Sequence, residues 1–381
     1  MNKLIYFIVV VAFLDTFVQL PIITPYALEL GASHVLTGGI VAVYSFTNMI
    51  GNIVGGHWID RFGRKRMLFS SMVAVSIILL FYLQVQTGEQ LFMVRLLHGL
   101  AGGILIPAAF AYIGDLSSDK SRGKTMAFTG ASIGIAAIVG PAFGGIMAAR
   151  ASIQSVFLFI AGLFIFTALL ILKFVKESFV ASERNKVRFS HFLPLLKQPL
   201  LLQASLAAFA LMVSNGTLAF AMPIKVDELG MTSETTGVLL SIFGIVALIV
   251  FLTPINRVYD HFQPISLVLF GIILIGVSLF MLSYLSSFSS SVLAMIVYGL
   301  GFAFIFPSMN QIVAESSTKI DRGKAYGIFY AFFSLGVVAG SSIAGAVTEV
   351  LGKPFVVSAI IMLTIGAILF GIARRMRHHK Q

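Results

Sequence analysis

The stretch Gly56-His57-Trp58-Ile59-Asp60-Arg61-Phe62-Gly63-Arg64-Lys65-Arg66 is the most informative part of this chain, because it lies between two long apolar runs and concentrates charges of both signs. Charged side chains are costly inside hydrocarbon, so we expect this segment at a membrane surface. It would form a turn between two membrane-spanning helices, and such a turn is a candidate hinge.

The composition of the chain indicates an integral membrane protein. Charged residues are 11% of its 381 residues and hydrophobic residues are 58%, whereas an ordinary soluble domain has about 25% charged residues. The apolar segment that begins at Leu4 has no small-residue cleavage site after it, so we expect a retained helix rather than a signal peptide. The absence of Cys excludes disulfides and thiolate metal sites.

Neither an enzyme nor a metal protein is expected. Gly123-Lys124-Thr125 is similar to the end of a phosphate-binding loop, but Ser118 stands where the first glycine of that loop belongs. The tail pair His378-His379 is expected to be part of a solvated basic end. We therefore predict no catalytic residues, no metal site and no cofactor.

Twelve stretches are long and apolar enough to cross a membrane as helices, since about 20 residues span the hydrocarbon core. Strands of a membrane barrel would be about half as long and would alternate in polarity. The predicted spans are 4–28, 37–59, 67–86, 90–113, 125–148, 155–175, 200–222, 237–256, 265–285, 291–313, 325–348 and 355–373.

The basic residues indicate the orientation of these spans. Of the 26 Lys and Arg residues, all but Arg95, Arg150, Lys225 and Lys353 fall on one side, in the termini, the even-to-odd loops or the central segment. By the positive-inside rule both termini are cytoplasmic. The net charge of +11 thus reflects topology, and no nucleic-acid partner is expected.

The chain divides into two related halves. The only long polar interruption, 176–199, separates a bundle at 1–175 from a bundle at 200–381 and is predicted to be a cytoplasmic linker. A shift of 200 residues places Gly99-Leu100 on Gly299-Leu300 and Pro107 on Pro307, among other matches. An internal repeat in a membrane protein of many spans is typical of a transporter whose substrate site lies between the repeats.

The opening stretch resembles the signature of the major facilitator superfamily, nearly residue for residue, in Gly56, Asp60-Arg61 and Gly63-Arg64-Lys65. The resemblance implies two pseudo-symmetric six-helix bundles, with spans 1, 4, 7 and 10 around a central cavity. It also implies a monomer in the cell membrane, for this chain the cytoplasmic membrane of a bacterium.

Two further motifs resemble the drug:proton antiporter branch of that family. The run from Arg95 to Gly103 is similar to its fourth-span signature, with His98 where Gln is usual. The run Gly140-Pro141-Ala142-Phe143-Gly144-Gly145 is similar to its fifth-span motif, with Ala136 in place of an earlier glycine. Small residues let helices approach closely, and general helix packing is the alternative explanation of these glycines.

We expect proton coupling to involve Asp15, Arg95 and His98. Asp15 lies about 18 Å from the cytoplasmic end of the first span, or about 12 Å from its outer end, and Arg95 lies about 8 Å from the outer end of the fourth span. The two could therefore pair directly. Gln19 follows Asp15 by one turn on the same helical face. A buried charge in a span should face a cavity or a partner. The alternatives are structural roles: a hydrogen-bonding Asp15, an Arg95 that binds helix carbonyls, and a His98 that is an uncharged cavity residue.

The predicted function is proton-coupled export of small, mostly hydrophobic compounds by alternating access, with small molecules, protons and the lipid bilayer as partners. Substrate-cavity candidates are Gln19, Asn48, Asn215 and Asn310. Two other functions are open: a specific exporter or flippase for a sugar, metabolite or lipid, and a receptor or scaffold that transports nothing.

The charged turn is the predicted conformational gate: Gly56, Asp60, Arg61, Gly63, Arg64, Lys65 and Asp115. The resemblance implies an ion pair between Arg64 and Asp115. We further expect Asp60 to dock on the start of the eleventh span, near Ala325, where unpaired N–H groups carry partial positive charge. The alternative is that Asp60 only balances the neighbouring basic residues.

Overall fold

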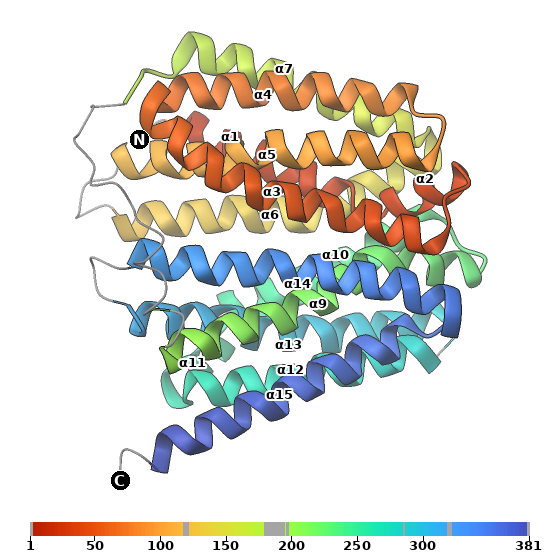
Figure 1. Cartoon of the computed structure of the whole chain (residues 1–381), viewed down its shortest axis with the longest axis vertical. Coiled ribbons are helices and arrows are strands. Elements are labelled where there is room, and N and C mark those ends of the chain that lie inside the picture. The colour runs from red at the N-terminus through yellow and green to blue at the C-terminus, as the bar shows by residue number, and fades with distance from the viewer. Residues whose placement is uncertain are drawn as a thin grey trace. The chain divides into compact units, whose positions relative to one another are not determined.

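The computed structural model describes residues 3–116, 122–178, 195, 198–284, 286–317 and 322–378, and every regular element in these ranges is a helix (Figure 1). Residues 179–194 and 196–197, most of the predicted linker, lie outside the described ranges.

The N-terminal half consists of helices that follow one another with short connections. They are α1 (Lys3–Val18), α2 (Ile23–Glu29), α3 (His34–Phe62), α4 (Arg64–Phe81), the 3-10 helix η1 (Tyr82–Gln84), α5 (Gly88–Leu116), α6 (Arg122–Arg150) and α7 (Ile153–Phe174).

The C-terminal half has the same character. Its elements are α9 (Pro199–Glu228), α10 (Ser233–Leu252), the 3-10 helix η3 (Pro254–Arg257), α11 (Val258–His261), α12 (Pro264–Tyr284), α13 (Phe288–Glu315), α14 (Arg322–Leu351) and α15 (Pro354–His378).

Each of the twelve predicted spans corresponds to one long helix, apart from the first, which is a bent pair. Within the described residues, ten helices are long and apolar enough to cross a membrane, and α1 with α2 makes an eleventh, bent by 43°. The bend lies beside Pro21, which has no backbone N–H to donate. The remaining helix, α3, has 29 residues but carries Asn48 and Asn52 in its middle, which lower its apolarity.

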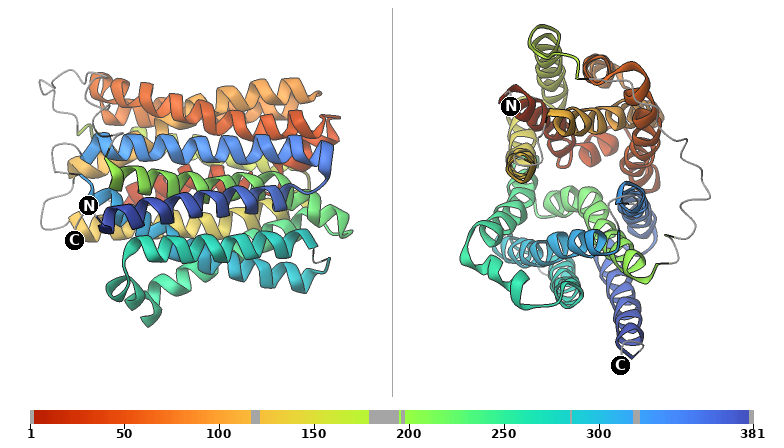
Figure 2. Two further views of the ribbon diagram at one scale, coloured as in Figure 1. Left: turned by 60° about the horizontal axis from the view of Figure 1, so that its bottom comes forward. Right: turned by 90° about the vertical axis from the view of Figure 1, so that its left-hand side faces the viewer.

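The contacts divide the chain into two compact units. One contains 1–183 and 223–241, and the other contains 184–222 and 242–381, so α9 and α10 each contribute to both. In the first unit α3 packs along α5, α4 lies against α5 and α7, and α1 lies against α6. In the second unit α12 packs on α13 and α15 (Figure 2). The predicted division at 176–199 stays a prediction.

Glycines allow the tight contact between α3 and α5 that positions the site. A Cβ added at Gly99 would overlap the hydroxyl of Thr47 and the carbonyl of Tyr44, and one at Gly103 would overlap the carbonyl of Asn48. The residues around His98 are therefore held against the backbone of α3. Any larger residue at Gly99 would push the two helices apart.

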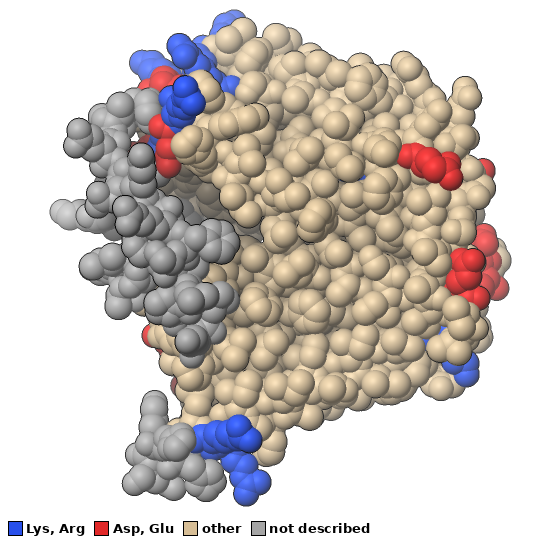
Figure 3. Space-filling view, in the orientation of Figure 1, with Lys and Arg blue, Asp and Glu red and all other residues tan. Residues whose placement is uncertain are grey.

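The outer surfaces of the helices are apolar. On the face shown in Figure 3, Lys, Arg, Asp and Glu lie almost entirely near the ends of the helices. Large apolar side chains are exposed between those ends, for example Ile53 at 71% and Met93 at 60%. Such a surface is unfavourable in water and suits lipid contact, in agreement with a protein that crosses the membrane many times.

Candidate functional site: a buried polar network and a charged turn

Asp15 lies in the last turn of α1, a helix that is otherwise almost wholly apolar. Its residue is 3% exposed, and it is the only carboxylate among the buried residues of the described chain. Gln19, the residue directly after α1, donates from Nε2 to Asp15 Oδ1 at 2.7 Å and to the carbonyl of Asp15 at 3.0 Å. The predicted shared face of these two residues is confirmed.

His98 of α5 is the partner of Asp15. The ring is completely buried, and its Nε2 lies 3.0 Å from Asp15 Oδ2. Its other nitrogen, Nδ1, lies 3.0 Å from the hydroxyl of Tyr82. Both ring nitrogens thus have a hydrogen-bonding partner, and three residues from α1, α5 and η1 form a continuous chain.

Arg95 reaches the same network by another route. Its Nη1 donates to Gln19 Oε1 at 2.6 Å, its Nε donates to the carbonyl of Ile40 at 3.3 Å, and its guanidinium lies over the ring of Tyr44 at 4.3 Å. Gln19 therefore lies between the two charges. The expected direct pair of Asp15 and Arg95 is replaced by an amide bridge, because the bend after α1 directs Gln19 toward α5.

The second unit contains an uncharged counterpart of this site. The shift of 200 residues places Tyr298 on His98, and the Tyr298 hydroxyl lies 2.8 Å from the hydroxyl of Ser214. The ring of Tyr44 meets His98 edge-on at 5.2 Å, and Phe243 meets Tyr298 edge-on at 5.5 Å. The same packing is therefore built twice, with ionisable partners in the first copy.

The candidate cavity residues occupy different surroundings. Gln19 is fully engaged by Asp15 and Arg95. Asn48 accepts from Asn52 Nδ2 at 3.0 Å, and Asn310 donates from Nδ2 to the carbonyl of Phe306 at 2.8 Å. Asn215 is half-buried on α9 beside Ser214. Their role in binding substrate stays a prediction.

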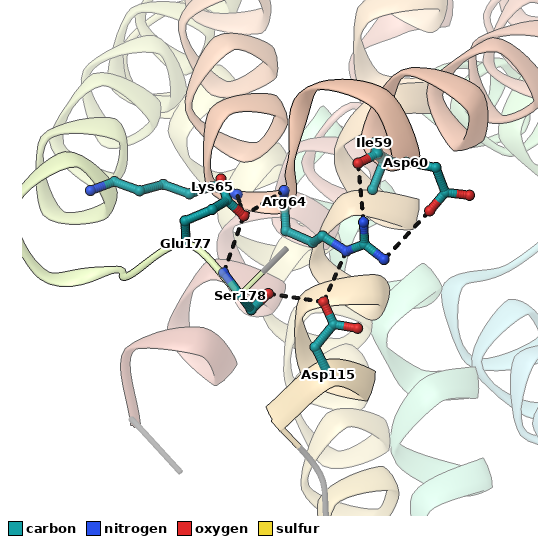
Figure 4. Close-up of polar contacts among 7 residues, drawn as sticks. All are labelled: Ile59, Asp60, Arg64, Lys65, Asp115, Glu177 and Ser178. Carbon is teal, nitrogen blue, oxygen red and sulfur yellow. Dashed lines mark hydrogen bonds and ion pairs between the residues drawn. The ribbon is translucent and has the colours of Figure 1, made fainter. Parts of the chain in front are cut away.

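The charged turn joins three helices (Figure 4). Arg64 Nε lies 2.9 Å from Asp115 Oδ2, so the ion pair that the resemblance implied is confirmed. Arg64 Nη2 also lies 3.4 Å from Asp60 Oδ1, and its Nη1 donates to the carbonyl of Ile59 at 3.2 Å. The guanidinium thus binds the last turn of α3 to the last turn of α5.

A carboxylate that follows α7 covers the start of α4. Glu177 Oε1 accepts from the backbone N–H of Arg64 at 2.9 Å and of Lys65 at 3.3 Å (Figure 4). These are two of the donors that a helix leaves unpaired at its first turn. Lys65 in turn donates from Nζ to the carbonyl of Leu172 on α7 at 2.9 Å.

Gly63 has a backbone conformation that its neighbours require. Its φ is 97° and its ψ is 160°, and a Cβ there would lie 2.6 Å from Glu177 Oε2. Two other members of the predicted gate make fewer contacts: Gly56 has no atom within 4 Å of the position of a Cβ, and the guanidinium of Arg61 lies over Phe62 at 5.3 Å.

The sequence matches the Major Facilitator Superfamily over residues 5–317 and again over 204–381. The chain belongs to this superfamily. As a member, it is a membrane transporter of small molecules. Among its curated relatives is "Multidrug resistance protein 1" of Bacillus subtilis, 26% identical over 94% of this chain and 92% of the relative. Another is "Quinolone resistance protein NorA" of Staphylococcus aureus, 25% identical over 98% and 95%.

Solved structures have the same fold. A bacterial homolog of the human lysosomal transporter Spinster matches with a TM-score of 0.80 over 98% of this chain and 96% of its own, at 13% identity. The human organic anion transporter MFSD10 matches with a TM-score of 0.70 over 96% and 98%, at 16% identity. The predicted all-helical transporter architecture is confirmed.

The glycine motif of this superfamily member lies against two helices. A Cβ at Gly140 would come within 2.6 Å of Phe17 Cβ, and one at Gly144 would overlap the carbonyl of Val18, both on α1. On the other side, a Cβ at Gly145 would overlap the carbonyl of Ser233, and the carbonyl of Pro141 faces Gly237. The motif is thus a close-packing surface within the first unit.

Two functional candidates were missed by the sequence analysis. Tyr82 follows an apolar run and carries no motif, so nothing in the sequence connects it with His98. Glu177 fell into the segment interpreted as a linker; its position directly after the sixth predicted span was the available signal. Ser178, beside it, donates to Asp115 at 2.9 Å (Figure 4).

Proposed function

We propose that this transporter exports small hydrophobic or amphipathic compounds in exchange for protons, by alternating access. It would act in the cytoplasmic membrane of a bacterium, as a monomer with both termini in the cytoplasm. The observation that carries the proposal is the buried network of Asp15, Gln19, Arg95 and His98.

A buried carboxylate beside a histidine is suited to hold and release a proton. Insertion scales give a charged side chain near the middle of a span a cost of about 2.5–3.5 kcal/mol, so it is retained where it has a use. Asp15 and His98 are in direct contact, and Arg95 is one amide away. A scaffold would need none of these groups, and the second unit has only neutral groups at the corresponding place.

The names of the relatives support multidrug-type export. Two of them are called multidrug or quinolone resistance proteins, and their similarity extends over more than nine-tenths of this chain. A polyspecific site needs adaptable apolar walls, and the chain offers 35 Phe and 15 Met for that purpose.

We test the proposal in proteoliposomes with a pH-sensitive dye inside. Addition of a lipophilic cation should move protons in the wild type, and Asp15→Asn should abolish this movement. The matched control is Glu89→Gln, which removes an exposed carboxylate at the start of α5 and should behave as the wild type. Undiminished proton movement in Asp15→Asn would contradict the proposal. Proton movement that neutral sugars cause and the lipophilic cation does not would favour a specific exporter.

A further inference from the structure

Asp15, His98 and Tyr82 are linked by hydrogen bonds, and Tyr82 is the member of this buried network to which neither a motif nor the proposed function assigns a role. Its residue is completely buried, its ring stacks on Phe157 at 4.2 Å, and its backbone carbonyl accepts from the hydroxyl of Tyr26 at 2.6 Å. These contacts hold the hydroxyl 3.0 Å from His98 Nδ1. A hydroxyl can donate or accept a hydrogen bond there.

We propose that Tyr82 is a positioning residue for proton coupling, whose hydroxyl donates to His98 when the Asp15–His98 pair is unprotonated and accepts from it when the pair has taken up a proton. The inference rests on the proposed proton coupling. The two roles of the Tyr82 hydroxyl depend on how many hydrogens the two ring nitrogens of His98 and the carboxylate of Asp15 carry between them.

In the unprotonated pair the Asp15 carboxylate can only accept. His98 Nε2 must then carry the ring hydrogen, and Nδ1 accepts from Tyr82. One added proton gives either an imidazolium beside a carboxylate or a carboxylic acid that donates to Nε2. In both cases Nδ1 carries a hydrogen, so Tyr82 must become the acceptor.

The surroundings leave His98 no other partner for Nδ1 in this arrangement. The elements around the ring present Asp15 from α1, Tyr44 from α3, Tyr82 from η1 and Arg95 from its own helix α5. Tyr44 meets the ring edge-on, and Arg95 donates to Gln19 and also interacts with the Tyr82 hydroxyl rather than with the ring. A hydroxyl oxygen has two acceptor positions, so Tyr82 can still accept from His98. The hydroxyl of Tyr82 is therefore the group that decides how well the protonated ring is accommodated.

The test is Tyr82→Phe, which keeps the stack on Phe157 and the backbone carbonyl. Loss of the hydroxyl leaves a buried N–H without a partner in the protonated form, and a bond to a charged donor is the stronger one. Uptake of a proton by the Asp15–His98 pair should therefore be less favourable in Tyr82→Phe than in the wild type. The midpoint of the pH profile of transport should move to lower pH by about half to one unit.

Two comparisons make the result specific. Tyr298→Phe, which removes a buried hydroxyl at the position in the second unit that corresponds to His98, should leave the midpoint in place. In a His98→Gln background, Tyr82→Phe should cause no further shift. An unchanged or higher midpoint in Tyr82→Phe, or the same shift without His98, would overturn the inference.

A second measurement keeps this inference separate from the proposed function. The chain has 7 His, and the ¹⁵N signal of His98 can be assigned by its loss in His98→Gln. A hydrogen-bonded Nδ1 in the wild type that becomes free in Tyr82→Phe supports the contact. If the wild type moves no protons but the His98 signal changes in Tyr82→Phe, the proposed proton coupling is wrong and the contact between Tyr82 and His98 is supported. An unchanged His98 signal in Tyr82→Phe contradicts that contact.

Discussion

Gly63→Ala should destabilise the charged turn in two ways that can be measured separately. The conformation at φ 97° and ψ 160° belongs almost only to glycine, and a side chain there costs about 1–3 kcal/mol. The new Cβ would also lie 2.6 Å from Glu177 Oε2 and displace the carboxylate from the start of α4. Loss of a helix cap costs about 0.5–2 kcal/mol, so we expect a total of about 2–4 kcal/mol.

Reversible unfolding in SDS, followed by tryptophan fluorescence, measures this cost. Trp58 is the only tryptophan and lies on the last turns of α3, close to Gly63. The control is Gly56→Ala, in the same helix, where nothing lies within 4 Å of the new Cβ. It should be as stable as the wild type or more so, because alanine favours helix by about 0.5–1 kcal/mol.

Glu177→Ala separates the two contributions. If the Cβ of residue 63 acts partly by displacing Glu177, the two substitutions share one cause. The loss of unfolding free energy in the double variant, Gly63→Ala with Glu177→Ala, should then be about 1 kcal/mol smaller than the sum of the losses in the single variants. Additive losses would show that Glu177 and Gly63 act independently, and a loss below about 0.5 kcal/mol in Gly63→Ala would refute the reasoning about both strain and cap.

Three further predictions concern the gate and the packing. Arg64→Asp and Asp115→Arg should each lower transport and together recover part of it, although the partly exposed pair is worth only about 0–1 kcal/mol; no recovery in the double variant would argue against a direct functional pair. Asp60→Asn should change the distance between spin labels at the end of the second span near Asp60 and at the start of the eleventh span near Ala325. The substitution would remove a few tenths to about 1 kcal/mol of preference for the conformation in which Asp60 docks on that helix start, and identical distance distributions would rule out the docking. The chain has no Cys, so labels can be placed without background. Gly144→Ala should lower stability by about 1–3 kcal/mol, because its Cβ overlaps the carbonyl of Val18, whereas Gly134→Ala on the same helix has open space and should not; equal stabilities in thermal unfolding would contradict the packing argument.

Several features could be predicted from the sequence because they depend on local composition. A run of about 20 apolar residues has to bury its backbone hydrogen bonds in a helix, so the twelve helices followed from their lengths. The spacing of Asp15 and Gln19 placed them on one helical face without knowledge of any neighbour. The pair of Arg64 with Asp115 followed from a resemblance to a family in which both positions are charged.

Other features depend on how helices rotate and bend against one another, and a sequence does not state these angles. The depth of Asp15 and Arg95 in their spans suggested a direct pair, but in the folded chain Gln19 lies between them, and His98 contacts Asp15 from α5. Tyr82 reaches the buried network from the segment that follows α4, and Glu177 reaches the charged turn from the segment that follows α7. Composition and spacing therefore indicated which polar groups would lie within the membrane. Which of them form hydrogen bonds depends on how the helices pack, because a shift of a few tenths of an ångström changes which atoms are within hydrogen-bonding distance.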